Sequence, residues 1–232
     1  MRRRGLGALL AILSGLPFAS FASSPAAPSG TSDGWKVDSQ KGGVTIYSRP
    51  RAGSKLKEFK AVGEIEAPTR AVQNVLVDVE AYTSFMPFTT ECRVVKREEN
   101  SLLAYQRLSP KLVSDRDYTI RIREKSWPEK DGLAYLHRWE PANEFGPPEK
   151  KGVLRVKLCE GSWLLEPKSA DKTRATYSIY TDSGGALPAF LANTASEIAI
   201  RKVFAAVRKQ VKQSKYHSRA PHQNPANLYV SE

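Results

Sequence analysis

Apolar and polar positions alternate along most of this chain, and the pattern changes to a helical period near the C-terminal end. Alternation with a period of two is typical of β-strands that bury one face. Turn signals such as Glu99-Asn100 and Pro128 to Gly132 separate the runs. We therefore predict antiparallel strands at Gly43 to Ser48, Lys55 to Ile65, and about residues 89–98, 101–108, 115–125, 132–140, 153–165 and 173–182.

Two segments show helical periodicity instead. Pro68 to Val79 begins with a residue that favours a first helical turn and repeats apolar residues at helical spacing. A longer helix is predicted at about 188–214, with an apolar arc of about 100° that includes Phe204 and Val207. We expect this face to pack on the sheet and the opposite, basic face to lie in water. The basic residues are Arg201, Lys202, Arg208, Lys209 and Lys212.

These elements predict an α+β fold in which one long C-terminal helix covers the concave face of a curved antiparallel sheet. If the sheet curls, the space between the sheet and the helix forms an internal cavity. The alternative is that side chains fill this space completely. The chain shows no internal repeat, so a single domain over residues 35–214 is expected.

Four segments between Asp78 and Val211 carry a more specific pattern. They are Asp78-Val79-Glu80-Ala81-Tyr82 with Phe85-Met86-Pro87; Ser114-Asp115-Arg116-Asp117-Tyr118; Pro148 to Leu154; and Gly184-Gly185-Ala186-Leu187-Pro188 with Phe190 to Asn193. In this order they resemble the START (steroidogenic acute regulatory protein-related lipid transfer) domain family, although Phe85 stands where tryptophan is often seen and a long N-terminal helix is lacking. The resemblance implies a helix-grip fold with one cavity for a sterol, phospholipid, ceramide or other apolar molecule. The wider superfamily also includes polyketide cyclases and aromatases.

The N-terminal residues follow the order of a secretory signal peptide. Arg2 to Arg4 precede an uncharged apolar stretch, and small residues allow cleavage after Ala22. We predict a signal peptide at 1–22, with an uncleaved membrane anchor as the alternative. Residues 23–34 are expected to form a linker and residues 215–232 a flexible tail. The protein would then be periplasmic or secreted.

The formal net charge of +12 falls to +9 when the three arginines of the signal peptide are removed with no acid. A basic surface suits transient contact with anionic membranes, and an exported protein is not expected to bind nucleic acid. Because the basic residues are spread along the chain, solvated strand faces account for most of the charge. Export permits a disulfide between Cys92 and Cys159, and two buried free thiols are equally consistent with their strand positions.

Strand parity predicts which polar residues face the cavity. Arg116 and Tyr118 share a face with Ile120 and Ile122. An inward arginine is costly unless it is paired, so its partner would be a protein carboxylate or a ligand head group. Parity along 153–165 places Glu160 inside, and Arg116 with Glu160 is therefore the predicted ion pair. The alternative is a structural pair that never contacts ligand.

Three further polar residues are predicted to face inward. His137 shares its parity with Tyr135 and Trp139, and either a hydrogen-bonded core histidine or a ligand contact fits that position. Tyr105 and Tyr177 would present hydroxyl groups that orient a ligand in an apolar pocket.

The sequence contains no H-E-x-x-H zinc motif, no phosphate-binding glycine loop and no dinucleotide fingerprint. We therefore expect no catalytic residue, no metal and no cofactor. The predicted function is that of a monomeric carrier or sensor for a lipid or sterol-like ligand. Two alternatives stay open: a cyclase- or hydrolase-type enzyme that uses Arg116, His137 and a tyrosine for proton transfer, and a basic module that docks on membranes.

Overall fold

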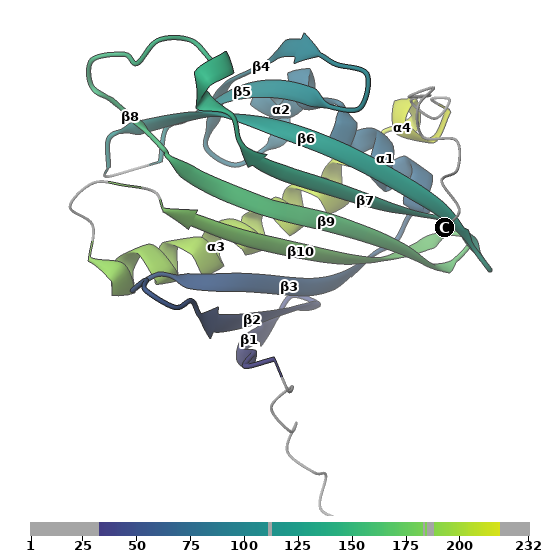
Figure 1. Ribbon diagram of the computed structural model, residues 1–232. Helices are drawn as coiled ribbons and strands as arrows, with labels where there is room; N and C mark the ends of the chain where they lie inside the picture. Colours follow the sequence, from purple (N-terminus) through teal and green to yellow (C-terminus); the bar gives the residue numbers. More distant parts are fainter. Residues whose placement is uncertain (1–32, 111–112, 183, 185–187, 219–232) are drawn as a thin grey trace, which may run out of the picture. The chain divides into compact units, whose positions relative to one another are not determined.

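Ten strands form one sheet in the part of the chain that the computed structural model describes, residues 33–110, 113–182, 184 and 188–218. Neighbouring strands follow the order β1-β2-β3-β10-β9-β7-β6-β5-β4 and are antiparallel, and the short β8 pairs in parallel with β6 (Figure 1). The strands are β1 (Lys36–Lys41), β2 (Val44–Pro50), β3 (Lys57–Ile65), β4 (Thr89–Arg97), β5 (Leu102–Leu108), β6 (Asp115–Glu129), β7 (Gly132–Pro141), β8 (Val153–Arg155), β9 (Leu158–Ser169) and β10 (Lys172–Asp182).

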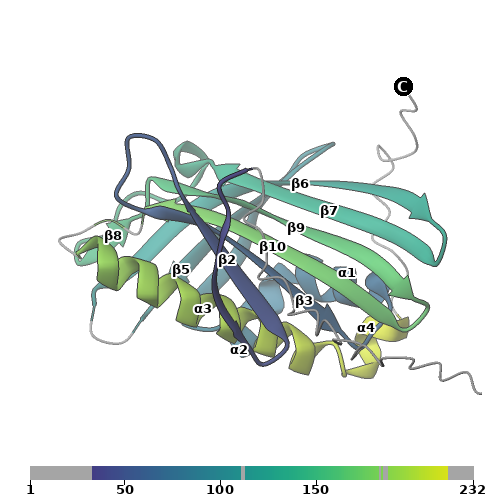
Figure 2. The same cartoon turned by 90° about the horizontal axis from the view of Figure 1, so that it is seen from below.

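One long helix, α3 (Ala189–Gln210), runs along a single face of the curved sheet (Figures 1 and 2). The helix α1 (Thr69–Val77) and the short α2 (Tyr82–Phe85) lie on the same face. Short turns of 3₁₀-helix occur at η1 (Val79–Ala81) and η2 (Asn143–Phe145). The predicted fold class, a curved antiparallel sheet that grips a C-terminal helix, is thereby confirmed.

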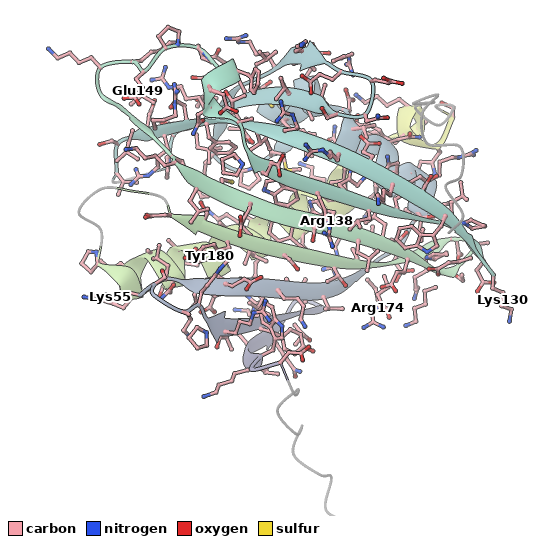
Figure 3. All side chains as sticks on the ribbon, in the orientation of Figure 1. Lys55, Lys130, Arg138, Glu149, Arg174 and Tyr180 are labelled. Carbon is pink, nitrogen blue, oxygen red and sulfur yellow. The ribbon has the colours of Figure 1, made fainter. Side chains whose placement is uncertain are left out.

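The sheet has two unlike faces, which we call inner and outer. The inner face carries α1 and α3 and forms one hydrophobic core with them. Along β3, residues alternate between buried and half-buried, as the sequence pattern predicts. The outer face is turned away from α3 and carries Arg138 of β7 and Tyr180 of β10 (Figure 3). Members of the core include Ile46, Phe59, Trp163, Leu165, Val72, Phe204 and Val207.

The two halves of α3 are held differently. The second half buries the apolar residues that the helical period predicts, namely Ile200, Phe204 and Val207, with Val211 directly after the helix. The described side chains of 190–199 are all half-buried or exposed. Gly63 of β3 allows this close packing, because a Cβ atom there would lie 2.9 Å from the Phe204 ring. The first half of the helix is therefore the more loosely attached.

The basic side of α3 is not simply a solvated face, in contrast to the prediction. Arg208 donates hydrogen bonds to the carbonyl oxygens of Gly42 (2.7 Å), Gly43 (2.8 Å) and Glu64 (2.9 Å). Arg201 donates to the carbonyl oxygen of Lys41 at 2.7 Å. The guanidinium groups thus satisfy backbone acceptors at the β1–β2 turn, and they fasten the second half of the helix to the N-terminal hairpin.

The domain continues beyond the predicted boundary at residue 214. Helix α4 (Ser214–Ser218) packs on α1 and buries Tyr216. Asn74 of α1 donates to the Tyr216 carbonyl oxygen at 2.8 Å, and the Tyr216 hydroxyl donates to Asp78 at 3.1 Å. Residues 215–218 therefore belong to the fold, while the rest of the expected tail lies outside the described residues.

The predicted signal peptide at 1–22 and most of the linker at 23–34 also lie outside the described residues. Within the described ranges, no helix combines the length and the apolar character needed to cross a bilayer.

Candidate functional site

A row of aromatic rings crosses the inner face from strand to strand and ends on α3. Trp139 of β7 stacks on Tyr177 of β10 with 5.8 Å between ring centroids. Tyr177 also contacts Trp163 of β9 at 4.6 Å, and Trp163 contacts Phe204 of α3 at 5.2 Å. Tyr118 of β6 faces the same core. Antiparallel pairing of β7, β9 and β10 brings these rings together from three distant parts of the chain.

Several of these rings are incompletely covered although they lie deep in the protein. Tyr118 and Tyr177 of this row keep accessible surface, and so does Tyr82 of α2. Burial nevertheless raises the pKa of each hydroxyl group. Partly accessible aromatic rings on an inward face are candidates for contact with a bound molecule.

Two tyrosine hydroxyls of this region already have protein partners. Tyr118 donates to Oε1 of Gln106 at 2.7 Å, and Tyr82 donates to the carbonyl oxygen of Leu76 at 2.7 Å. No partner is recorded for the Tyr177 hydroxyl among the described residues, which leaves it able to bond a polar atom of a ligand. The prediction that Tyr118 and Tyr177 face inward agrees with the structure; whether they contact ligand stays a prediction.

Arg116 also lies on the inner face, at the start of β6. It shares the parity of Tyr118 and pairs in register with Leu154 of β8. Only 7% of the residue is exposed. Its Nη1 atom donates to the carbonyl oxygen of Ser114, and no carboxylate of the described residues forms an ion pair with it. The predicted pair of Arg116 with Glu160 is therefore wrong.

Glu160 lies on the outer face, where Nη1 of Arg51 donates to its carboxylate at 2.6 Å. The reason is a break in the predicted strand at Val156 and Lys157, between β8 and β9. Alternation restarts after the break, so that Cys159 and Trp163 face inward. Alternation that restarts with β9 places Trp163 on the inner face, whereas alternation continued from residue 153 places it on the outer face.

Tyr105 is fully buried, but it lies under the outer face. Its hydroxyl donates to Oδ2 of Asp117 at 3.0 Å, and Arg155 binds the same carboxylate at 2.7 Å. The segment that contains η2 covers this cluster, since Asn143 accepts a hydrogen bond from the Thr119 amide at 2.8 Å. Burial, and then the bond to Asp117, raises the pKa of Tyr105 to about 12. Both faces of β5 are buried here, so buried and exposed residues do not alternate along it, and strand parity cannot distinguish its inner face from its outer face.

His137 is buried on the inner face, as parity predicts, at the end covered by α1. Its Nε2 atom contacts Oε1 of Gln73, and its Nδ1 atom lies 3.8 Å from Glu124, to which Gln73 donates at 3.1 Å. Burial lowers the pKa of His137 to about 4 and raises the pKa of Glu124. The imidazole is therefore neutral at pH 7, and the three side chains join α1 to β6 and β7.

The cysteines are free thiols in the structure. Burial raises the pKa of Cys92 to about 12 and that of Cys159 to about 11. Both are accordingly protonated at neutral pH and are poor nucleophiles. Among the described residues, no group of three or more His, Cys, Asp or Glu side chains could hold a metal ion.

One short motif fits a nucleophile template by its letters alone. Gly30 to Gly34 reads G-x-S-x-G, the signature of a serine that sits between a strand and a helix. Here the motif precedes β1, and Ser32 lies outside the described residues. Its position before the domain does not match the structural context that the signature requires.

A curved sheet closed on one side by a C-terminal helix defines the helix-grip class of fold. Residues 65–208 match the family model described as polyketide cyclase / dehydrase and lipid transport. The chain belongs to this family, and within it to the START-domain proteins.

The chain is similar to curated proteins over most of its length. It is 30% identical over 161 residues to an uncharacterised protein of Pseudomonas aeruginosa, covering 69% of this chain and 78% of that protein. It is 26% identical over 173 residues to the mouse phosphatidylcholine transfer protein, covering 73% and 80% respectively.

Solved structures give the same picture. The STAR-related lipid transfer protein of Xanthomonas axonopodis superposes with a TM-score of 0.69 at 28% identity, covering 78% of this chain and all of that one. Human STARD10 superposes with a TM-score of 0.68 at 20% identity, covering 83% and 80%. At that identity, the second match supports the fold alone.

Proposed function

We propose that the protein binds one lipid or other apolar molecule between the inner face of the sheet and α3, as a carrier or sensor. The observation that carries this proposal is the set of inward aromatic rings that keep accessible surface although burial raises the pKa of their hydroxyl groups. Two similar proteins are named for lipid transfer, one of them for phosphatidylcholine, which supports the same class of ligand.

The driving force for binding would be the burial of hydrocarbon. Each methylene group removed from water contributes about 0.8 kcal/mol, and part of the total is offset by ordering the ligand and the protein. Aromatic rings suit such a site, because they present a large and rigid apolar surface. A chain lying along Trp139, Tyr177 and Trp163 would replace contacts with water by contacts with these rings.

The four tryptophans offer a direct test. Trp139 and Trp163 face inward, whereas Trp35 and Trp127 do not belong to the inner row. A lipid with bromine atoms on its acyl chain should quench the fluorescence of the wild type. Quenching should fall in Trp139→Phe and Trp163→Phe and persist in the matched variants Trp35→Phe and Trp127→Phe. Equal quenching losses in all four variants, or none in the wild type, would reject an internal binding site.

We also propose binding without catalysis. A proton-transfer mechanism would depend on His137, and its two ring nitrogens face Gln73 and Glu124 rather than the aromatic row. The buried thiols are protonated, which removes them as nucleophiles at neutral pH. A turnover reaction that His137→Ala abolishes, found by incubating the protein with polyketide-like or ester substrates, would favour the enzyme instead.

Contact with a membrane is a further part of the proposal. Phe190 is 68% exposed and Leu191 is 44% exposed, and both lie in the first turn of α3. Apolar side chains on the more loosely held half of the helix could enter a bilayer surface, and the net positive charge favours anionic lipids.

Export rests on the order of residues in the N-terminal segment alone. If it is correct, fractionation of cells that produce the full chain should recover a protein shortened by the predicted 22 residues outside the cytoplasm. Full-length protein in the cytoplasmic fraction would reject this assignment.

A further inference from the structure

Arg116 is a buried cation on the inner face, and within the described ranges it has no counter-ion. Every Asp and Glu of the sequence except Glu232 lies in the described ranges, and none of these carboxylates comes within ion-pair distance of the guanidinium. One hydrogen bond, from Nη1 to the Ser114 carbonyl oxygen, is its recorded contact with the protein. A guanidinium has five N–H donors, so most of its capacity is available.

The acids that flank Arg116 in the sequence are already engaged elsewhere. Asp115 binds Arg107 at 2.6 Å, and Asp117 binds Arg155 at 2.7 Å. Alternation along β6 sends these two carboxylates to the opposite side of the strand from Arg116. Neither of them can neutralise its charge without breaking another ion pair.

A buried charge that is unpaired is costly, because it has lost its hydration without gaining an electrostatic partner. Only 7% of Arg116 is exposed, so bulk water compensates little. The cost disappears when an anion binds in the fork of the guanidinium, which matches the two oxygens of a carboxylate or phosphate. The geometry thus favours a ligand that brings its own negative charge.

The position of Arg116 also gives the ligand a direction. Arg116 pairs with Leu154 of β8, and Leu154 contacts Gly184, where a Cβ atom would lie only 2.6 Å from its Cδ2 atom. This is the end of the sheet at which α3 begins (Figure 1). The opposite end holds Glu124 and the neutral imidazole of His137, neither of which provides positive charge for an anionic group.

We infer that the ligand is an anionic amphiphile whose carboxylate or phosphate binds Arg116, while its hydrocarbon lies along the aromatic row toward His137. This inference rests on the proposed function, and it adds the charge and the orientation of the ligand. A fatty acid and a phospholipid head group share the required chemistry.

The test compares pairs of ligands that differ in charge. The delipidated protein is titrated with oleic acid and with oleyl alcohol, and then with phosphatidic acid and with diacylglycerol. Binding is followed by tryptophan fluorescence or calorimetry. At neutral pH, the wild type should bind at least one acid roughly 10- to 100-fold more tightly than its neutral counterpart, as expected for a charge-assisted hydrogen bond. The pair that shows the difference identifies carboxylate or phosphate as the group recognised.

Two variants locate the effect. Arg116→Met, which keeps an unbranched apolar stem but removes the guanidinium, should bind acids and neutral ligands alike. Arg116→Lys should keep part of the preference because it retains charge but loses the fork. Arg138→Met on the outer face is the matched control and should behave as the wild type (Figure 3).

The outcomes separate the inference from the proposed function. A wild type that binds acids and neutral ligands equally would overturn the inference, and so would an Arg116→Met variant that keeps the preference. The comparison within the wild type needs no variant, so a folding defect in Arg116→Met leaves the test intact. Failure to bind any of the four ligands would instead overturn lipid binding itself.

Discussion

Opposite charges stand side by side on β6 and are separated by the geometry of the strand. Asp117 is 1% exposed and is bound by Arg155 and Tyr105 under the outer face. Arg116, its neighbour in sequence, lies on the inner face, where no described carboxylate pairs with it. Because adjacent side chains of a strand point to opposite faces, the domain keeps one charge for its own stability and leaves the other available.

Asp117→Asn should destabilise the protein strongly. The change leaves Arg155 buried without a counter-ion, which typically costs about 3–5 kcal/mol. Urea unfolding would measure the loss. The matched control is Glu140→Gln, which breaks the pair with Arg123 at 2.6 Å in which both side chains are about half exposed, and it should cost less than about 1 kcal/mol. Equal losses would mean that the cluster under the outer face is not a buried ion pair in solution.

The buried His137 predicts a loss of stability in mild acid. The unfolded chain takes up a proton near the ordinary pKa of 6.5, whereas the folded protein does so only near pH 4. Unfolding is therefore favoured as the pH falls from 6.5 toward 4, by about 3 kcal/mol for this group. Glu124 acts in the opposite sense, because its raised pKa lets the folded state bind a proton earlier than the unfolded chain does.

His137→Gln isolates this contribution. Its unfolding free energy, measured between pH 7 and pH 4.5, should fall less than that of the wild type, since the variant has no imidazole to protonate. His217→Gln, on the exposed surface of α4, should follow the wild type. A variant at 137 with an unchanged pH profile would show that His137 is not buried and neutral in solution.

At the scale of elements, alternation predicted the sheet well wherever one face of a strand is buried and the other is not. It failed in three places for separate physical reasons. β1 was missed because Lys36–Lys41 buries almost nothing and has no apolar period. Tyr105 was misassigned because the segment with η2 covers the outer face of β5. Glu160 was misassigned because the strand breaks between β8 and β9, where the inward residues Val156 and Cys159 are three positions apart. One extra residue at such a break inverts every later assignment.

The inward orientation of the predicted polar residues was correct only on uninterrupted strands. Arg116, Tyr118, His137 and Tyr177 are all inward as expected. That no carboxylate of the described residues pairs with Arg116 could not be derived, because ion pairing depends on which strands become neighbours and in which register. The resemblance of the segments around Tyr118 and Gly184 to a known family supplied the architecture that local patterns do not contain.

The loosely held half of α3 predicts how ligand enters. Among its few polar contacts is the bond from the Lys57 amide to Oδ1 of Asn193, at 3.2 Å. A disulfide between Lys57→Cys and Asn193→Cys should slow lipid exchange by roughly tenfold or more, equivalent to ~1.4 kcal/mol of added opening free energy. Reduction of the same variant should restore the rate, which makes it its own control. Exchange that is equally fast in both forms would mean that ligand passes elsewhere.

At the scale of the whole domain, the site is built with two chemically different ends. The end where α3 begins has Arg116 and the exposed Phe190 and Leu191. The other end is closed by α1 and α4, where Asn74, Asp78 and Tyr216 are joined by hydrogen bonds. Ligand would therefore approach from the first end, which is also the end suited to contact a bilayer.

Replacing Phe190 and Leu191 together by serine should weaken binding to anionic vesicles by about 2 kcal/mol, because two exposed apolar side chains no longer enter the lipid. Sedimentation with vesicles measures this binding. Phe145→Ser on η2, where the phenylalanine is 42% exposed, is the matched control and should bind as the wild type. If both changes act alike, general surface hydrophobicity rather than the start of α3 governs the contact.

Because the two halves of α3 are attached unequally, different parts of the helix can govern the lifetime of the folded domain and the residence time of a ligand. Arg201, Arg208 and Phe204 fix the second half of the helix to the sheet, so we expect changes confined to the first half to affect global unfolding little. The first half can open locally at a smaller free energy, and if lipid binds as proposed, this opening would set how long the ligand stays bound. Substitutions at positions such as Asn193 can therefore give variants with graded retention times on a scaffold whose resistance to denaturation is unchanged.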